Sequence, residues 1–187
     1  MAEFLYSLDV SLFRFFNETI SNSVSDKFFP FVTDVKNWHI AYIIVWFIVF
    51  FKGGKAGKIT AVTALFLIAV SDQISSTFIK NIVGRIRPCT ALEKVNILAG
   101  CTGSFSFPSS HAVNNFAIAV YFSVFFPKFR NLLFVIASVV AFSRIYCGVH
   151  YPSDVAGGAI IGAAIGYLFA IITKILSSKI KLLNIQE

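Results

Sequence analysis

Three short segments of the sequence contain the side chains that could perform chemistry, and they occupy residues 80–88, 107–111 and 143–154. The first contributes lysine and arginine, the second two serines and a histidine, and the third an arginine, a histidine and an aspartate. Cations neutralise the oxygens of a transferring phosphoryl group, and histidine serves as a nucleophile or as a general acid. This set of residue types predicts phosphoryl transfer if the fold brings the three segments together.

The first segment, KNIVGRIRP, places Lys80 and Arg87 seven residues apart. On a continuous helix this spacing puts both side chains on one face, where two cations repel each other unless an anion lies between them. The alternative is that these long side chains extend toward lipid head groups, which is common at a membrane surface. Taken alone, the segment favours this alternative.

The second segment, FPSSH, has a Pro-Ser order typical of a helix start and would place His111 in the first turn. Free backbone N–H groups and the helix dipole attract phosphate at such an end, and the hydroxyls of Ser109 and Ser110 add donors. His111 could act there as a general acid or base. The alternative is an ordinary capped helix with a histidine at the membrane interface.

In the third segment, which begins at Ser143-Arg144, His150 and Asp154 are four residues apart. On a helix that spacing places a carboxylate beside an imidazole. The carboxylate would fix the tautomer and raise the basicity of the other ring nitrogen, so that the histidine could act as a nucleophile or a base. The alternative is that Asp154 caps a helix after Pro152 and that His150 is exposed.

The elements that must position these segments are membrane helices. Of the 187 residues, 57% are hydrophobic and only 13% are charged, whereas a soluble domain has about 25% charged residues. This composition excludes a soluble globule and a disordered chain, and the length allows one domain. The apolar runs are continuous rather than alternating, which favours helices over strands. Five runs are predicted to span the bilayer, at residues 38–51 (extended back toward 36), 59–79, 112–126, 132–147 and 155–173.

Residues 1–35 differ because they mix apolar side chains at helical spacing with charged ones. A span there would bury Arg14 and Glu18, at a cost of about 2.5–3.5 kcal/mol for each charge. An amphipathic helix in the membrane interface is therefore predicted, and no cleavable signal peptide is expected at residues 1–7. The predicted fold is all-α, a polytopic membrane helical bundle of about five transmembrane helices plus this interfacial helix.

The net charge of +7 is explained by topology. Basic residues gather at 52–58, 128–130 and 174–181, and five spans put these three segments on one face, which the positive-inside rule makes cytoplasmic. The three chemical segments then share the opposite face, which favours one common site over three separate structural explanations. No nucleic-acid partner is predicted. No cluster has metal-ligand spacing, so neither a metal nor another cofactor is expected.

The chain resembles the type 2 phosphatidic acid phosphatase family of integral membrane lipid phosphatases. That family has three motifs, Lys-x6-Arg-Pro, Pro-Ser-Gly-His and Ser-Arg-x5-His-x3-Asp. All three spacings fit here across residues 80–154, and Ser110 stands where the second motif has glycine. The motif positions are Lys80, Arg87-Pro88, Pro108-Ser109-Ser110-His111, Ser143-Arg144, His150 and Asp154.

The resemblance implies a role for each motif residue. His150 would attack phosphorus and carry a phosphohistidine, Asp154 would orient it, and His111 would protonate the leaving group. Arg85 lies outside the motifs and receives no role. The residues implied to bind the phosphate are Lys80, Arg87, Ser109, Ser110 and Arg144.

The resemblance narrows the substrate to a lipid phosphate or diphosphate: lipid A 1-phosphate, undecaprenyl diphosphate or phosphatidylglycerophosphate. The orientation predicts a multi-pass protein of the bacterial inner (cytoplasmic) membrane whose active site faces the periplasm. Residues 1–187 are expected to form one phosphatase domain, comprising the interfacial helix (1–35), the bundle with its catalytic loops (36–174) and a cytoplasmic tail (175–187). The alternatives are a transporter or flippase that binds lipid phosphate without cleaving it, a structural subunit, and a soluble vanadium haloperoxidase, which the apolar composition disfavours.

Several further residues have structural interpretations. Cys89 and Cys101 lie in the outer loop, where an oxidising compartment permits a disulfide, and Cys147 is expected to be a packed thiol. Asp72 within the second span could belong to a proton or ion path, but a hydrogen-bonded residue that ties helices together is favoured. Glycines at 158, 162 and 166 predict close helix packing.

Overall fold

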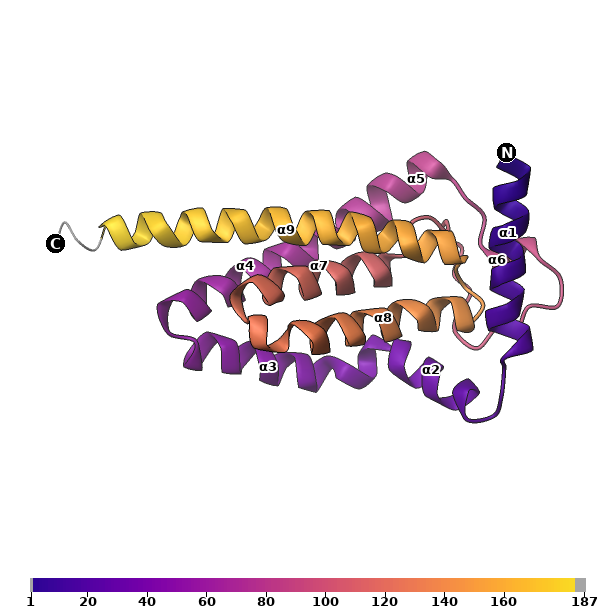
Figure 1. The fold of residues 1–187 in the computed structure, drawn as a ribbon, viewed down its shortest axis with the longest axis horizontal. Coiled ribbons are helices and arrows are strands. Elements are labelled where there is room, and N and C mark those ends of the chain that lie inside the picture. The colour runs from indigo at the N-terminus through magenta and orange to yellow at the C-terminus, as the bar shows by residue number, and fades with distance from the viewer. Residues whose placement is uncertain (1, 184–187) are drawn as a thin grey trace.

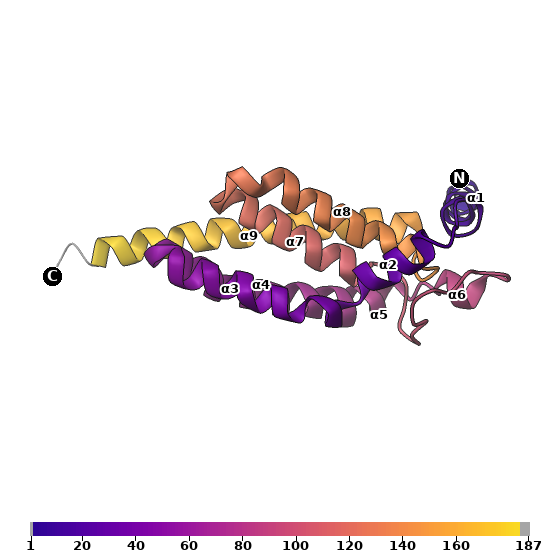
Figure 2. The same cartoon turned by 90° about the horizontal axis from the view of Figure 1, so that it is seen from below.

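The computed structural model describes residues 2–183 and shows a bundle of long helices, with no strand in that range (Figure 1). The long helices run side by side, and a second view at right angles shows the same arrangement (Figure 2). The predicted all-α membrane bundle is therefore confirmed. The long helices are α3 (His39–Lys52), α4 (Gly54–Gln73), α7 (Ser110–Phe125), α8 (Arg130–Tyr146) and α9 (Pro152–Leu183).

Four helical stretches within the described residues are long and apolar enough to cross a membrane: Val35–Lys52, Gly54–Ala91, Pro127–Tyr146 and Pro152–Ser178. The remaining predicted span is α7, whose 16 residues extend about 24 Å, less than the roughly 30 Å of a bilayer core. This helix packs against α4, α8 and α9 and so lies inside the bundle. The span predicted at residues 112–126 is therefore a shorter helix enclosed by the other helices.

The second span ends irregularly, and this changes how the first motif is positioned. Helix α4 continues into the π-helix η3 (Ile74–Ile79) and the short helix α5 (Lys80–Val83), which stops at Gly84 with a left-handed φ of 62°. Arg87 follows in extended backbone before helix α6 (Pro88–Ala91). Lys80 and Arg87 would share a face only on a continuous helix, and that condition is not met, because the helix ends between them.

The N-terminal segment forms two helices instead of the single predicted one. Helix α1 (Ala2–Arg14) continues into the π-helix η1 (Phe15–Thr19), and α2 (Ser25–Thr33) follows after a turn. The turn is capped by Asn22, whose side-chain oxygen accepts from the backbone N–H of Ser25 at 3.0 Å. Helix α1 lies across one end of the bundle and is seen end-on in Figure 2.

The two ends of the bundle differ in what they carry. The α3–α4 turn, the α7–α8 connection and the C-terminal end of α9 lie at the end far from α1 (Figure 1). These are the connections that hold the three basic segments found in the sequence. The start of α7 and the α8–α9 turn lie at the end that α1 covers, so the chemical segments are separated from the basic ones.

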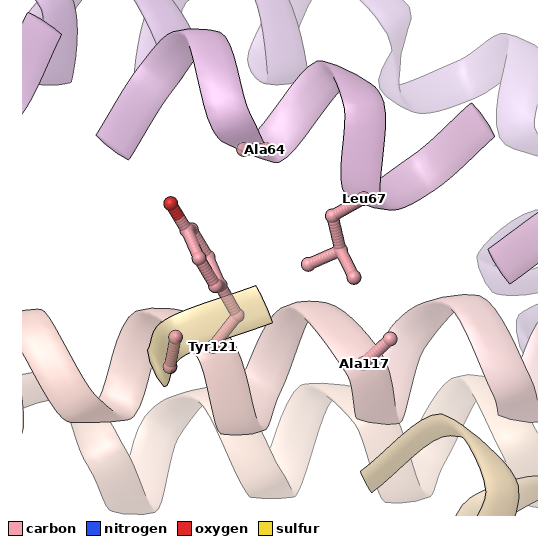
Figure 3. Close-up of a cluster of buried hydrophobic side chains, with 5 residues drawn as sticks. Ala64, Leu67, Ala117 and Tyr121 are labelled. Atoms are coloured by element: carbon pink, nitrogen blue, oxygen red, sulfur yellow. The ribbon is translucent and has the colours of Figure 1, made fainter. Parts of the chain in front are cut away.

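Close packing of α7 on α9 depends on the predicted small-residue face. A Cβ atom added to Gly162 would overlap the backbone oxygen of Val113, and one added to Gly166 would overlap that of Ala117. On the other side of α7, Figure 3 shows Ala117 and Tyr121 opposite Ala64 and Leu67 of α4. Helix α7 is thereby held between α4 and α9, which fixes its N-terminal end.

We expect Gly162→Ala to lower the melting temperature, because the added methyl group pushes on backbone that cannot rotate away. Overpacking of this kind costs about 1–3 kcal/mol. Thermal unfolding in detergent measures the effect. The control is Gly100→Ala, since a Cβ at Gly100 meets no atom within 4 Å. Equal melting temperatures for the two variants would contradict this account of the α7–α9 contact.

Candidate active site

The three chemical segments meet at the end of the bundle that α1 covers. Lys80 follows the π-helix η3, Ser109 precedes the first residue of α7, and residues 143–154 include the end of α8, a turn and the start of α9. Hydrogen bonds join the segments, because Ser109 N donates to Asp154 O at 3.1 Å and Arg87 Nη1 donates to Val149 O at 3.0 Å. The fold therefore brings together residues that are up to 74 positions apart in the sequence.

His150 lies at the centre of this site and is only 2% exposed. Its Nε2 is 3.2 Å from Arg87 Nη1. Because arginine only donates, Nε2 must accept, and the proton of the ring lies on Nδ1. Nδ1 is 3.4 Å from the hydroxyl of Ser106, which donates to Asp154 Oδ2 at 2.5 Å. The lone pair of Nε2 thus faces an arginine that could hold a phosphate.

Asp154 lies on the Nδ1 side of His150, as the spacing predicted. Its Oδ2 is 3.6 Å from Nδ1, which exceeds an ordinary hydrogen bond, so its influence on the imidazole is through charge and through Ser106. The carboxylate is fully buried and also accepts from the backbone N–H of Tyr151 at 2.9 Å. The alternative of an exposed His150 beside a simple helix cap is excluded by this burial.

Burial lowers the pKa of His150 to about 3, which outweighs the opposing influence of Asp154. The imidazole is therefore neutral at physiological pH, since an ordinary histidine pKa is about 6.5. A neutral imidazole keeps its Nε2 lone pair free, and a nucleophile needs that lone pair.

Two buried basic side chains, Arg87 and Lys80, are held by the loop that also carries Ser106. Arg87 is 6% exposed and donates to the backbone oxygen of Ser104 at 2.7 Å and to its hydroxyl at 2.9 Å. Lys80 is 4% exposed and donates from Nζ to Phe105 O at 2.7 Å. The loop at 104–106 thereby fixes both cations, and it holds Arg87 against the imidazole of His150.

Two buried polar atoms of the motif residues have no hydrogen-bond partner, namely Ser109 Oγ and Arg144 Nε. A buried donor without a partner is costly, so such atoms are good candidates for binding a ligand. Ser110, the first residue of α7, has ordinary helical backbone, since Lys94 alone among the described non-glycine residues has a positive φ. The glycine of the motif is therefore not needed at this position for its backbone angle.

His111 and Arg144 share a partner that the sequence did not suggest. His111 Nε2 is 3.3 Å from the backbone oxygen of Thr33, and Arg144 Nη1 donates to the hydroxyl of Thr33 at 2.8 Å. A carbonyl oxygen only accepts, so Nε2 of His111 carries a proton. Burial, together with the charges of Arg144, Lys80 and Arg87, lowers the pKa of His111 to about 3, so without a bound anion the imidazole is neutral with its proton on Nε2.

Residues outside the motifs complete the site. Cys89 and Cys101 are joined by a disulfide with a Cα–Cα distance of 6.3 Å, which ties the loop that follows Arg87. Cys147 is buried and unpaired, as expected for a packed thiol. Asp72 accepts from Asn114 Nδ2 at 3.1 Å and so connects α4 with α7, in agreement with the helix-tying interpretation.

The family model described as the PAP2 superfamily matches residues 60–177, a range that contains all three motifs. The chain belongs to the PAP2 superfamily. A lipid A 4′-phosphatase of Bacteroides thetaiotaomicron is 33% identical, over 97% of this chain and 84% of that protein. A bacitracin transport permease protein of Bacillus licheniformis is 30% identical, over 83% of this chain and 75% of its own. The crystal structure of Aquifex aeolicus LpxE matches with a TM-score of 0.69 and 29% identity, covering 87% of this chain and 94% of that one.

This PAP2 protein is a multi-pass membrane protein, and its relatives include curated phosphatases. The matched range contains Lys80, Arg87, His111, Arg144 and His150, which are all motif positions.

Proposed function

We propose that this PAP2 protein hydrolyses a phosphate monoester of a membrane lipid through a phosphohistidine on His150. The observation that carries the proposal is the position of His150 Nε2, an unprotonated and buried nitrogen 3.2 Å from the guanidinium of Arg87. A nucleophile beside a fixed cation is what phosphoryl transfer requires, because the reaction depends on position and on charge neutralisation.

In the first step, Nε2 of His150 attacks phosphorus, and the bond between phosphorus and the lipid oxygen breaks. His111, doubly protonated while the phosphate anion is bound beside it, gives one ring proton to that oxygen, so the lipid leaves as an alcohol and a neutral imidazole remains. Arg87, Lys80 and Arg144 neutralise the phosphoryl oxygens, with further donation from Ser109 and the start of α7. Asp154 stabilises the positive charge that the imidazole gains when it becomes phosphorylated.

In the second step, a water molecule attacks phosphorus on the side opposite to His150. His111 now accepts a proton from the water, since it lost its own proton in the first step. The phosphorus–nitrogen bond breaks, inorganic phosphate leaves and His150 returns to its starting state. Apart from the attacking water, every group used in this cycle is a side chain or a backbone N–H of the chain itself, and the proposal includes no metal. Among the described residues, no group of three or more His, Cys, Asp or Glu side chains is placed to hold one.

The substrate class that we favour is a lipid A phosphate monoester, including the one at the 4′ position. The similarity to the lipid A 4′-phosphatase over nearly the whole chain supports this choice. The 4′ position was absent from the three substrates that the sequence suggested. Undecaprenyl diphosphate and phosphatidylglycerophosphate remain the comparison substrates.

The location that we propose is the bacterial inner membrane, with the site facing the periplasm. The support is the separation of the basic connections from the active-site end of the bundle (Figure 1). The positive-inside rule then assigns the basic end to the cytoplasm.

We expect purified protein in detergent to release phosphate from lipid A in the presence of EDTA, at the rate seen without EDTA. The assay compares lipid A phosphorylated only at position 4′, lipid A phosphorylated only at position 1, undecaprenyl diphosphate and phosphatidylglycerophosphate. The highest kcat/KM is expected for a lipid A monoester. Complete loss of activity in EDTA that zinc or magnesium restores would contradict the metal-free mechanism.

The second candidate function is transport, because one relative is named a transport permease. The same protein preparation tests it. Protein in vesicles that moves a lipid phosphate between leaflets without releasing phosphate would favour transport. Phosphate release without movement would favour the phosphatase.

A further inference from the structure

Arg85 lies outside the three motifs, yet it makes the shortest ion pair to the carboxylate that faces His150. Its Nη1 is 2.6 Å from Asp154 Oδ1, and its Nη2 is 2.6 Å from Asp9 Oδ2. Asp9 belongs to α1, so the guanidinium joins the N-terminal helix to the start of α9. The three side chains form a carboxylate–guanidinium–carboxylate chain that ends at the active site.

The arrangement of Asp9, Arg85 and Asp154 is rigid. Arg85 also lies over the ring of Tyr151, with 4.1 Å between the guanidinium carbon and the ring centroid. Asp9 is held by Ser153, whose backbone N–H and hydroxyl both donate to it, at 2.9 and 2.5 Å. Both carboxylates are buried, whereas the Arg85 side chain is 22% exposed. The guanidinium is therefore held by two carboxylates, Asp9 and Asp154, and each of these is held in turn by other hydrogen bonds.

We propose that Arg85 and Asp9 are positioning residues for the reaction, and that α1 is thereby part of the catalytic unit. The proposal rests on the proposed role of His150 as the nucleophile. Asp154 has two carboxylate oxygens, of which Oδ2 serves Ser106 on the imidazole side and Oδ1 is taken by Arg85. Arg85 thus sets the rotation of the carboxylate, and that rotation sets the position of Ser106 and the charge felt by the imidazole.

Besides the packing of the buried Phe13 on Tyr151, helix α1 reaches the start of α9 through Asp9. A cleft of about 500 Å³ lies between α1 and the start of α9, and Leu5, Leu8 and Leu12 line it. Asp9 and Arg85 lie in the same cleft and bridge it by their ion pair. Loss of the Asp9 charge would leave Arg85 with one carboxylate instead of two, and the guanidinium could then turn away from the geometry that holds Asp154.

The test uses Arg85→Gln, Arg85→Lys and Asp9→Asn in the full-length protein, with the initial rate of phosphate release from lipid A as the readout. We expect Arg85→Gln to lower kcat about 10- to 100-fold with KM nearly unchanged, because a small displacement of a reacting group costs about that much. Arg85→Lys should recover part of the loss, since an ammonium can contact one carboxylate but not bridge two. Asp9→Asn should lower kcat less than Arg85→Gln does.

The matched control is Arg14→Gln, which also removes a guanidinium from an ion pair of the same helix. Arg14 pairs with Glu18 at 2.7 Å, the two side chains are 41% and 36% exposed, and this pair is separate from the Asp9–Arg85–Asp154 contacts. Its kcat should equal that of the unaltered protein. Melting temperatures are recorded for every variant, so that loss of folded protein is separated from a slower reaction.

A double variant tests the route of the effect. If Arg85 acts through Asp154, Arg85→Gln should cause no further decrease of kcat in protein that already carries Asp154→Asn. The proposal would be overturned if Arg85→Gln lowered kcat in the Asp154→Asn protein by the same factor as in the unaltered protein. Wild-type kcat in both Arg85→Gln and Asp9→Asn would also overturn it. Where Arg85→Gln fails to fold, Asp9→Asn decides, because that variant keeps both the Arg85 and the Asp154 side chains. Failure of the proposed function is distinct, since unaltered protein would then release no phosphate.

Discussion

His150→Ala is expected to abolish turnover while the protein still inserts and folds. Removing a covalent nucleophile typically costs a factor of about 10⁴ to 10⁶ in kcat. The structure gives the reason, because Nε2 of His150 is the unprotonated nitrogen that faces Arg87, and alanine offers no substitute. Phosphate release by equal amounts of folded protein measures the effect, and a quenched reaction with labelled substrate should show no labelled protein for this variant.

The control for this experiment is His39→Ala, which removes an exposed histidine at the start of α3 and should leave kcat unchanged. Unaltered protein, quenched in alkali during turnover, should carry an acid-labile label, as a phosphohistidine does. Hydrolysis by His150→Ala within tenfold of the unaltered rate would end the assignment of His150. A label at another residue would show that the nucleophile lies elsewhere.

The residues of the proposed site could be selected from the sequence because each motif is local. The spacing of four residues between His150 and Asp154 and the order Pro-Ser-Ser-His each indicate a chemical role without knowledge of the fold. Topology then predicted that the motifs share one face, since the spans alternate in direction. What spacing could not give is the path of the chain. A continuous helix would place Lys80 and Arg87 on one face, but the helix ends at Gly84.

The supporting residues could not be predicted because their partners are distant in the sequence. Asp9 contacts Arg85 across 76 residues and Thr33 contacts Arg144 across 111, and neither lies in a motif. Ser106 lies two residues before Pro108 but resembles any loop serine. The turn that divides the N-terminal segment did have a local signal in Asn22, a residue that often caps helices. The helical spacing of the apolar residues in this segment nevertheless led to the prediction of a single helix.

Asp154→Asn is expected to lower kcat about 10³- to 10⁴-fold, close to the effect of such a change in other histidine–aspartate pairs. The carboxylate accepts from Arg85, from Ser106 and from the backbone N–H of Tyr151. An amide can accept at one atom only, so its NH₂ group must face at least one donor, and its neutral charge no longer stabilises a phosphorylated imidazole. Asp34→Asn is the control, because Asp34 is exposed and its side chain accepts only from the backbone N–H of Lys36.

The double variant that carries both His150→Ala and Asp154→Asn separates two roles for Asp154. If the carboxylate acts only by orienting and stabilising His150, its loss should cost nothing once the imidazole is gone, and the double variant should match His150→Ala. Effects of groups that act as one unit are strongly non-additive in this way. A further fall of tenfold or more would show that Asp154 contributes to residual hydrolysis by itself, and would contradict a role that runs through His150 alone. Arg85 contacts both Asp154 and Asp9. If Asp154 acts through His150 alone, any effect that Asp9 and Arg85 exert through Asp154 must also depend on His150.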